Sequence, residues 1–292
     1  MIRTMEHVKK MGKTRELSEF QWDKFSHYRT KFSDYEFPPL SIILPTLNCA
    51  QSVTLTLESI LSQDYPDFEV IIIEGGSEDR TLEIIKGFRD ERIKIFSVSS
   101  HARYEMLNKG ISQMSGQYVC FMFPGDFYIH HDTLRFMMSI ALEHALPDLV
   151  YCGTLIRDGR NEVKILYREL NDKMLQRGNQ PTSLQSCWFK KNVFKEIGKF
   201  NPDYTLRGGF DLLCRFVKTR SLRHASAYRV LTDYDLRQVS RRMVLRHFWE
   251  TFLTVFKYYG LWSAVVWLFR QKDTSRFFKL WLRSFRVAFL GR

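Results

Sequence analysis

The hydrophobic and polar positions of residues 40–152 alternate between two kinds of segment. Some segments are short and almost continuously apolar, which is typical of strands buried on both faces of a parallel sheet. The others place apolar side chains on one face of a helix. The apolar runs are residues 40–44, 68–73, 93–98, 118–123 and 149–152, and the helical segments are 52–63, 77–88, 104–114 and 133–144. This alternation predicts a doubly wound α/β fold.

The pattern is weaker after residue 153. Residues 163–167 and 225–231 are compatible with further strands, and residues 191–197 and 210–218 with helices. The sequence contains no internal repeat and no low-complexity segment. We therefore expect one α/β domain that extends over residues 38–240.

Residues 1–37 form a distinct arm ahead of this domain. Phe25, Tyr28, Phe32 and Tyr35 recur at helical spacing and would make one aromatic stripe. Two prolines follow and end the arm, because a residue before proline avoids the helical conformation. We expect a helix that lies on the main domain, and a helix that binds a membrane surface or a partner is the alternative.

Residues 241–292 combine basic and aromatic side chains. Eleven Lys and Arg residues face only two acids, so most of the chain's formal net charge of +12 lies here. The stretch 248–269 is long enough to span a bilayer, but it contains charged residues and a glycine. This pattern favours amphipathic helices on an anionic membrane surface. A helical pair docked on the core and a true membrane span are the alternatives.

Composition narrows the class of protein. A chain that is 45% hydrophobic and 15% aromatic is not a disordered protein. Its positive charge implies an acidic partner, which can be nucleic acid, an anionic membrane or a phosphorylated substrate. The five scattered cysteines lack zinc-site spacing and are expected to be buried free thiols in a reducing compartment. The first residues lack an apolar core, so we expect no secretory signal.

Two loops lie where predicted strands end. They read Pro-Thr-Leu-Asn at 45–48 and Glu-Gly-Gly-Ser at 74–77. Both loops open at the same edge of a parallel sheet, which is where ligands bind. Asn48 and Glu74 carry groups that can read a nucleobase or ribose, and Gly75 lets the backbone approach a ligand. The alternative is a helix cap at Asn48 and a tight turn at the glycines.

The predicted helix at 104–114 carries a second set of polar residues. Glu105, Asn108 and Lys109 share one helix surface, where Lys109 can contact a phosphate. An ordinary solvated face is the alternative.

A third candidate is the acid that follows the strand at 118–123. Asp126 ends the sequence Phe-Pro-Gly-Asp. A carboxylate at this edge can hold Mg²⁺ or Mn²⁺, which neutralises a nucleoside diphosphate leaving group. One carboxylate suffices when phosphates and waters supply the other ligands. The alternative is a cap for the next helix.

Four stretches of the sequence together carry a family resemblance. They are SIILPTLN, EVIIIEGGSEDRT, RYEMLNKGISQMSGQYVCFMFPGDFY and QSCWFKKNVFKEIGKFNPDYTLRGGFDLLCRF. In this order and spacing they resemble the family 2 glycosyltransferases, which have the GT-A fold. The third stretch is the closest match, and it is similar to enzymes that build capsule, exopolysaccharide and lipopolysaccharide. The resemblance runs over residues 41–240.

The resemblance implies a nucleotide-sugar donor, a divalent metal (Mn²⁺ or Mg²⁺) and a glycan or lipid-linked acceptor. It implies that the donor nucleotide is bound by Pro45, Thr46, Asn48, Glu74, Gly75, Ser77, Glu105, Asn108 and Lys109. It also places the metal at Asp126 and the acceptor beside Gln185 and Trp188.

The donor half keeps the family pattern well. Glu74 and Glu105 stand where Asp is usual, and both keep the charge. The metal motif is reduced, because Phe123 and Gly125 leave Asp126 as its single acid.

The acceptor half is eroded. Gly209 stands where the family has the Asp that acts as general base, and Leu184 replaces a frequent His. An inverting transfer needs a base to take the proton of the acceptor hydroxyl. Asp211 is the nearest surviving candidate and Asp203 a weaker one. Either Asp211 is catalytic, or the chain is a slow or inactive member.

These observations predict a helical arm at 1–37, a GT-A domain at 38–240 and amphipathic membrane-associating helices at 241–292. The expected activity is an inverting, metal-dependent hexosyl transfer in surface polysaccharide or lipopolysaccharide synthesis. The expected location is peripheral, on the cytoplasmic face of the cytoplasmic membrane. A degenerate glycosyltransferase that serves as a membrane-bound partner or scaffold is the alternative. Nucleic-acid binding is not expected, because no such motif accompanies the charge.

Overall fold

The structure is a computed structural model that describes residues 36–157, 163–236 and 240–271. Most of the predicted arm, with its aromatic stripe, lies outside the described residues. The same holds for the second half of the basic tail.

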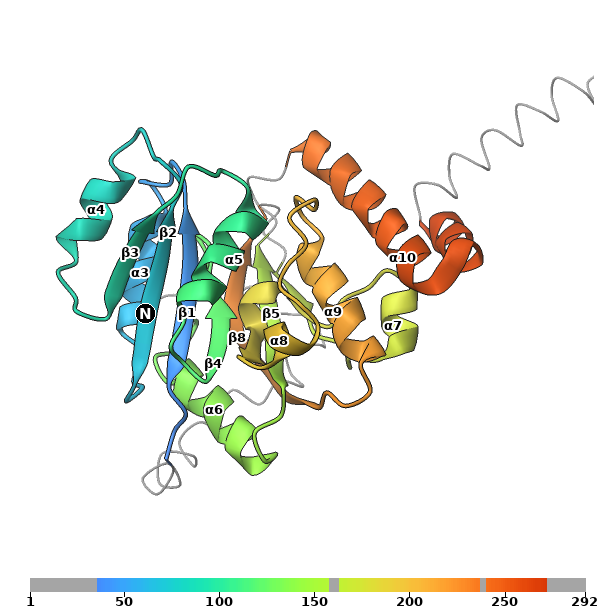
Figure 1. The fold of residues 1–292 in the computed structure, drawn as a ribbon, viewed down its shortest axis with the longest axis horizontal. Helices are drawn as coiled ribbons and strands as arrows, with labels where there is room; N and C mark the ends of the chain where they lie inside the picture. The colour runs from blue at the N-terminus through green and yellow to red at the C-terminus, as the bar shows by residue number, and fades with distance from the viewer. Residues whose placement is uncertain (1–35, 158–162, 237–239, 272–292) are drawn as a thin grey trace, which may run out of the picture.

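Eight strands of the described residues form one mixed sheet (Figure 1). They are β1 (Leu40–Thr46), β2 (Phe68–Glu74), β3 (Ile93–Ser97), β4 (Tyr118–Phe121), β5 (Leu149–Arg157), β6 (Val163–Leu166), β7 (Cys187–Lys190) and β8 (His224–Asp235). Their order is β3-β2-β1-β4-β7-β5-β6, and β8 also pairs with β5. The first four strands are parallel, whereas β7 is antiparallel to both β4 and β5. The sheet therefore confirms the predicted parallel half and adds a mixed half.

Helices cover both faces of this sheet (Figure 1). They are α3 (Val53–Leu61), α4 (Thr81–Gly87), α5 (Arg103–Gln113), α6 (Thr133–Glu143), α7 (Asp172–Gln176), α8 (Val193–Glu196), α9 (Gly208–Lys218) and α10 (Arg241–Arg270), with a 3-10 turn at Leu184–Ser186. The strands and helices predicted between residues 40 and 231 are present. Strand β7 was not predicted, because four residues are too few to show a period. Helix α4 starts four residues later than predicted.

The sheet separates two hydrophobic cores. Successive side chains of a strand point to opposite faces, so Ile42 and Ile43 of β1 belong to different cores. Ile42 packs with Leu57 of α3 and Met137 of α6. Ile43 packs in the second core, which includes Leu107 of α5 and residues of α7, α8, α9 and α10. Burial on both faces explains why these strands are continuously apolar.

Helix α10 packs against α7 and α9 at the edge of the domain (Figure 1). Its inner face buries Val255, Ala264 and Trp267 in the second core. Gly260 interrupts the helix with φ 80° and ψ 169°, a conformation that glycine adopts without steric cost. Glu250 is almost fully buried, and it anchors the helix by accepting hydrogen bonds from the domain. Residues 241–270 are therefore docked on the α/β core.

Candidate active site

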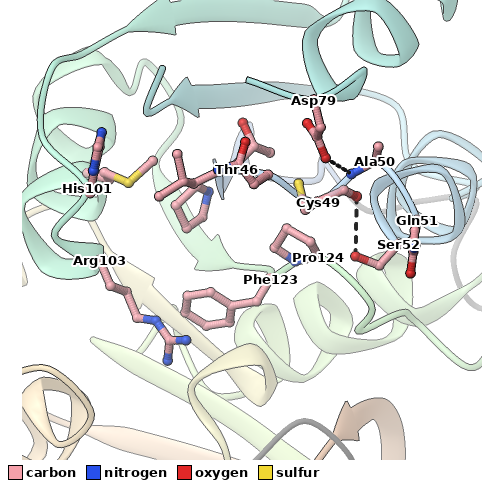
Figure 2. Close-up of a pocket in the computed structure, with 14 residues that line it drawn as sticks. Thr46, Cys49, Ala50, Gln51, Ser52, Asp79, His101, Arg103, Phe123 and Pro124 are labelled. Atoms are coloured by element: carbon pink, nitrogen blue, oxygen red, sulfur yellow. Dashed lines mark hydrogen bonds between the residues drawn. The ribbon is translucent and has the colours of Figure 1, made fainter. Parts of the chain in front are cut away.

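A cavity of about 570 Å³ opens at the carboxyl ends of β1 and β4 (Figure 2). It is lined by Pro45, Thr46, Leu47, Asn48, Cys49, Ala50, Gln51, Ser52, Asp79, His101, Arg103, Met106, Phe123 and Pro124. Three of the predicted donor residues, Pro45, Thr46 and Asn48, are among them. The position agrees with the rule that ligands of α/β sheets bind beyond the strands' carboxyl ends.

Asn48 joins the two loops that follow β1 and β2. Its backbone has φ 46°, in the left-handed region that Asn tolerates better than most residues. Its N–H donates to Ser77 Oγ at 3.0 Å, and its Oδ1 accepts from the Glu78 N–H at 2.8 Å. Asp79 adds a further link, because its Oδ2 accepts from the Ala50 N–H at 3.0 Å. The floor of the cavity is thus held in one geometry before a ligand arrives.

Glu74 shapes its own loop. Its carboxylate accepts from the Gly76 N–H at 3.0 Å and from the Ser77 N–H at 2.6 Å. Burial acts to raise the pKa of Glu74, but these hydrogen bonds outweigh it and hold the pKa below its usual value. Ser77 therefore belongs to the turn, and α4 starts at Thr81, whose N–H is capped by Asp79 at 2.9 Å. Neither Glu74 nor Ser77 lines the cavity.

Gly75 is packed behind the cavity wall. Its N–H donates to the Thr46 carbonyl at 2.9 Å. A Cβ at this position would lie 3.2 Å from Met106 Cε. The Ser100 carbonyl would lie 3.3 Å from the same Cβ, so the approach of α5 and of the segment before it leaves little room for a side chain.

Helix α5 presents a different face to the cavity from the one predicted. Arg103 and Met106 line it, three residues apart on one helix surface. Arg103 also lies over the ring of Phe123, with its Cζ 4.8 Å from the ring centre. The sequence analysis did not predict that Arg103 lines the cavity. Its position one helical turn before Leu107, a core residue, could have indicated this.

The three residues predicted on α5 lie elsewhere. Asn108 binds both backbone groups of Phe200, at 2.8 and 2.9 Å. Glu105 accepts from the Ser100 hydroxyl, and Lys109 is exposed. None of them lines the cavity, and their donor-binding role stays a prediction.

Asp126 is buried beside the cavity. Its Oδ1 accepts from the Asp235 N–H at 3.0 Å, and its Oδ2 accepts from the Gln185 side chain. Burial raises the pKa of Asp126 to about 7. Thr56 of α3 holds the turn before it, accepting from the Gly125 N–H at 2.9 Å and donating to the Asp126 carbonyl at 2.8 Å. This role of Thr56 was not foreseen.

The surroundings of Asp126 fit a cation in one respect. Its carboxylate is bound by neutral donors, while the nearby guanidinium of Arg157 pairs with Asp233 at 2.6 Å and with Asp235 at 3.5 Å. Within the described residues, no group of three or more His, Cys, Asp or Glu side chains is placed to hold a metal. A metal here would take one protein carboxylate, with phosphates and water completing its shell, as Mg²⁺ often does.

Asp211 belongs to the packing of α9 on α10. Its carboxylate is 1% exposed and accepts from Arg215 Nε at 3.0 Å, from Lys257 Nζ at 3.1 Å and from the Tyr258 hydroxyl at 2.8 Å. It does not line the cavity. The predicted base is thus held by two cations and a phenol, and its catalytic role stays a prediction.

The remaining acceptor-side residues are buried. Gln185 is bound to Asp126, and Trp188 is a core residue that stacks on Tyr128 with ring centres 6.3 Å apart. Gly209 lies in the first turn of α9. A Cβ there would meet Leu184 at 3.6 Å, an ordinary contact distance.

Comparison of the sequence with known proteins identifies a family for the domain that contains this cavity. A model of the glycosyl transferase family 2 domain matches residues 41–200. PGL/p-HBAD biosynthesis glycosyltransferases of Mycobacterium bovis and Mycobacterium tuberculosis are 29% identical over 201 residues, covering 68% of this chain and 77% of theirs. The Staphylococcus aureus poly(ribitol-phosphate) beta-N-acetylglucosaminyltransferase TarS is 30% identical over 109 residues, which is 36% of this chain and 19% of that protein.

Two solved structures share the fold. The S. aureus TarS 1–349 complex with UDP has a TM-score of 0.58 at 18% identity, over 80% of this chain and 66% of that one. The mannosyltransferase PcManGT from Pyrobaculum calidifontis, in complex with GDP-Man and Mn²⁺, has a TM-score of 0.55 at 14% identity, over 88% and 86%. They confirm the predicted GT-A fold. The family match covers more than half of the sequence, and the chain therefore belongs to the family 2 glycosyltransferases.

Proposed function

We propose that the chain transfers a hexosyl group from a nucleotide-sugar donor to a glycan or lipid-linked acceptor of the cell surface. The observation that carries this proposal is the cavity at the carboxyl ends of β1 and β4, whose floor is held by Asn48 and Asp79. The relatives support it, because their names describe PGL/p-HBAD biosynthesis and the transfer of N-acetylglucosamine to poly(ribitol-phosphate). Structures of similar fold hold UDP, UDP-GlcNAc or GDP-Man.

The residues of the cavity suggest how the donor is held. Backbone and side-chain groups of residues 45–52 face a ligand from one wall, and Arg103 and His101 face it from another (Figure 2). The first wall suits hydrogen bonds to a nucleoside, and the second suits a negatively charged diphosphate. A rigid floor also reduces the entropy lost when the donor is ordered.

A divalent metal is part of this proposal. Asp126 would be its protein ligand, since it is a buried hard-oxygen donor without a directly bound cation. When bound, Mn²⁺ or Mg²⁺ would neutralise charge on the departing diphosphate. The chain's own contribution is to hold Asp126 through Thr56, Gln185 and the Asp235 N–H.

The decisive experiment is thermal unfolding of the purified chain with UDP or GDP, each with and without Mn²⁺. We expect a rise in Tm with one nucleotide, and a further rise with Mn²⁺ that Asp126→Asn removes. Glu58→Gln, at an exposed acid on α3, two residues from Thr56, is the matched control. The absence of any shift with either nucleotide would contradict donor binding.

A degenerate, non-catalytic role is a second candidate, and Gly209 is the observation that favours it. The family's usual base is absent at this position, and Asp211 is occupied by Arg215, Lys257 and Tyr258. The space beside Gly209 accepts a side chain. Under the enzyme hypothesis the wild type turns over slowly and Gly209→Asp raises kcat by about 10²-fold, the lower end for general-base catalysis. A wild type without turnover, together with a Gly209→Asp variant that gains it, would establish the degenerate role.

We further propose that the chain works at the cytoplasmic face of a membrane, attached through residues 241–292. By length and composition alone, Arg242–Arg270 is apolar enough to cross a bilayer, and it contains an 18-residue window with a mean hydropathy of 1.3. A lipid-linked acceptor would be reached from this surface. The charge of the tail supports attraction to anionic lipid.

A further inference from the structure

Exposed apolar side chains of the described residues gather on α10. Among the described residues, ten large hydrophobic side chains are exposed, and eight of these ten lie on α10. They are Val244, Leu245, Trp249, Leu253, Phe256, Leu261, Trp262 and Phe269. Such a concentration on one element marks an interaction surface.

Four of these residues form one helical stripe. Leu245, Trp249, Leu253 and Phe256 follow each other at spacings of four, four and three residues, so they share one face. We call these four residues the outer stripe. Trp249 is 57% exposed and stacks on Phe252 with ring centres 5.8 Å apart. Large aromatic side chains of this kind suit the headgroup region of a bilayer, where one part is apolar and the other wet.

The charges beside the outer stripe are positive. Arg242, Arg246 and Lys257 are exposed on the helix, and the sequence that follows at 272–292 is also strongly basic. The acid of α10 in the described region, Glu250, is 5% exposed and turned toward the domain. The surface therefore complements an anionic bilayer rather than a neutral or cationic partner.

The inner face fixes the orientation of α10 on the domain. Glu250 accepts from the backbone N–H groups of Thr205, Leu206 and Arg207 at 2.9, 2.9 and 2.8 Å. Thr254 donates to the Tyr204 hydroxyl at 2.9 Å. Crossing a bilayer would break these bonds and place the Glu250 carboxylate in hydrocarbon, where it would have no hydrogen-bond partner from water. The helix is thus suited to lie in the plane of the membrane.

Two of the surface cations pair with carboxylates at the contact between α10 and the domain, Arg246 within α10 and Lys257 across to α9. Arg246 Nε lies 3.0 Å from Glu250 Oε1, and Lys257 Nζ lies 3.1 Å from Asp211 Oδ1. Their side chains are 56% and 50% exposed. A lipid phosphate that contacts either cation therefore lies next to a carboxylate that joins α10 to segment 205–211, either Glu250, which binds the backbone of residues 205–207, or Asp211 itself.

We propose that α10 lies flat on an anionic bilayer through its outer stripe, and that Arg246 and Lys257 link this contact to segment 205–211. The segment begins the acceptor-side helix α9, so lipid binding would order the part of the site that meets the acceptor. This inference deepens the membrane attachment proposed above and rests on the proposed function for its consequence in catalysis, whereas the lipid contact does not depend on donor binding.

Vesicle flotation of the full chain tests the contact. We expect the wild type to float with phosphatidylcholine vesicles that contain phosphatidylglycerol, to float poorly with phosphatidylcholine alone, and to detach as salt rises. Trp249→Ser combined with Phe256→Ser should lower binding at least 10-fold. Leu55→Ser combined with Tyr228→Ser is the control, because these two exposed residues lie away from α10. Equal binding of the two double variants would overturn the proposal, as would a dimer that only the α10 variant dissociates.

Hydrogen exchange tests the link. The amides of Thr205, Leu206 and Arg207 should exchange more slowly on anionic vesicles than in solution, and Arg246→Gln should reduce this protection. Unchanged exchange in bound wild type would overturn the link. Nucleotide-induced Tm shifts without vesicles are measured in parallel. Their loss would count against the proposed donor binding alone, and failed flotation with intact shifts would count against the membrane attachment alone.

Discussion

The two halves of this molecule use their carboxylates for opposite purposes. In the donor half, Glu74 and Asp79 bind backbone N–H groups of loops, and the loops they shape leave a cavity open. In the acceptor half, Asp211 and Glu250 bind cations, a phenol and backbone groups that fasten α10 to the domain. The same residue type thus builds a site in one half and a scaffold in the other. The partners decide which. Glu74 binds its own turn, whereas Asp79, Glu250 and Asp211 each have a partner 29 to 46 residues away along the chain.

The largest effect that this comparison predicts is on Glu250. Glu250→Ala removes the acceptor of three backbone N–H groups, so we expect a loss of about 3 kcal/mol or more in the free energy of unfolding. The Tm shift with nucleotide should persist, because the donor loops are untouched. Urea unfolding measures the loss. Exposed Glu143→Ala is the control, with an expected change within about 0.5 kcal/mol.

Acid unfolding provides the next test, at the donor half. Burial acts to raise the pKa of Glu69, but hydrogen bonds from Lys94, Ser41 and Ser115 outweigh it and lower the pKa to about 2. Because the folded pKa is depressed, its stabilisation is present above pH 4.5 and is lost as the pH falls toward 2, amounting to about 3 kcal/mol. Glu69→Gln should therefore lose less stability than wild type across this range. Parallel acid curves for the two proteins would refute the assignment.

The Asp211→Asn variant distinguishes a structural role of the Asp211 carboxylate from a role as general base. The amide keeps an acceptor for Tyr258 but loses the charge that holds Arg215 and Lys257, so we expect a loss of about 2 kcal/mol in unfolding free energy. We expect kcat to fall less than about 10-fold. A fall of 10² to 10⁴ with normal folding would instead identify Asp211 as the general base. Asp203→Asn, at an exposed position, is measured beside it.

The smallest effect concerns Asn48. Asn48→Ala forces a left-handed backbone on alanine and removes the acceptor of the Glu78 N–H, at a cost of about 1 kcal/mol. We expect the Kd for nucleotide to rise about 5-fold with little change in Tm. Asn48→Gly removes the strain of the left-handed backbone but still lacks the side-chain amide that binds the Glu78 N–H. If Asn48→Gly binds nucleotide as the wild type does, the side-chain link between the two loops is unimportant.

Much of the fold could be predicted from the sequence. The continuous apolar runs marked strands buried on both faces, and the order of the loops around Asn48, Glu74 and Asp126 indicated the family. These signals are local, since they depend on spacing within a few residues. Strand β7 was missed for the same reason, because CWFK is too short to carry a period.

The site was predicted in part. Periodicity correctly grouped Glu105, Asn108 and Lys109 on one surface of α5, but it did not say which surface meets the cavity. Packing of Leu107 into the core fixes the rotation of α5, and that rotation presents Arg103 and Met106 instead.

What the sequence by itself determined was the class of fold, the family and the loop after β1 that lines the cavity. What only the tertiary structure decided was the use of each polar group. Asp211 could be placed by motif, but its partner Lys257 is 46 residues away and on another helix. Likewise α10 reads as one amphipathic stretch, and only docking divides it into an anchored inner face and a free outer stripe. Pairings across long separations follow from the packing of whole elements, which no local pattern encodes.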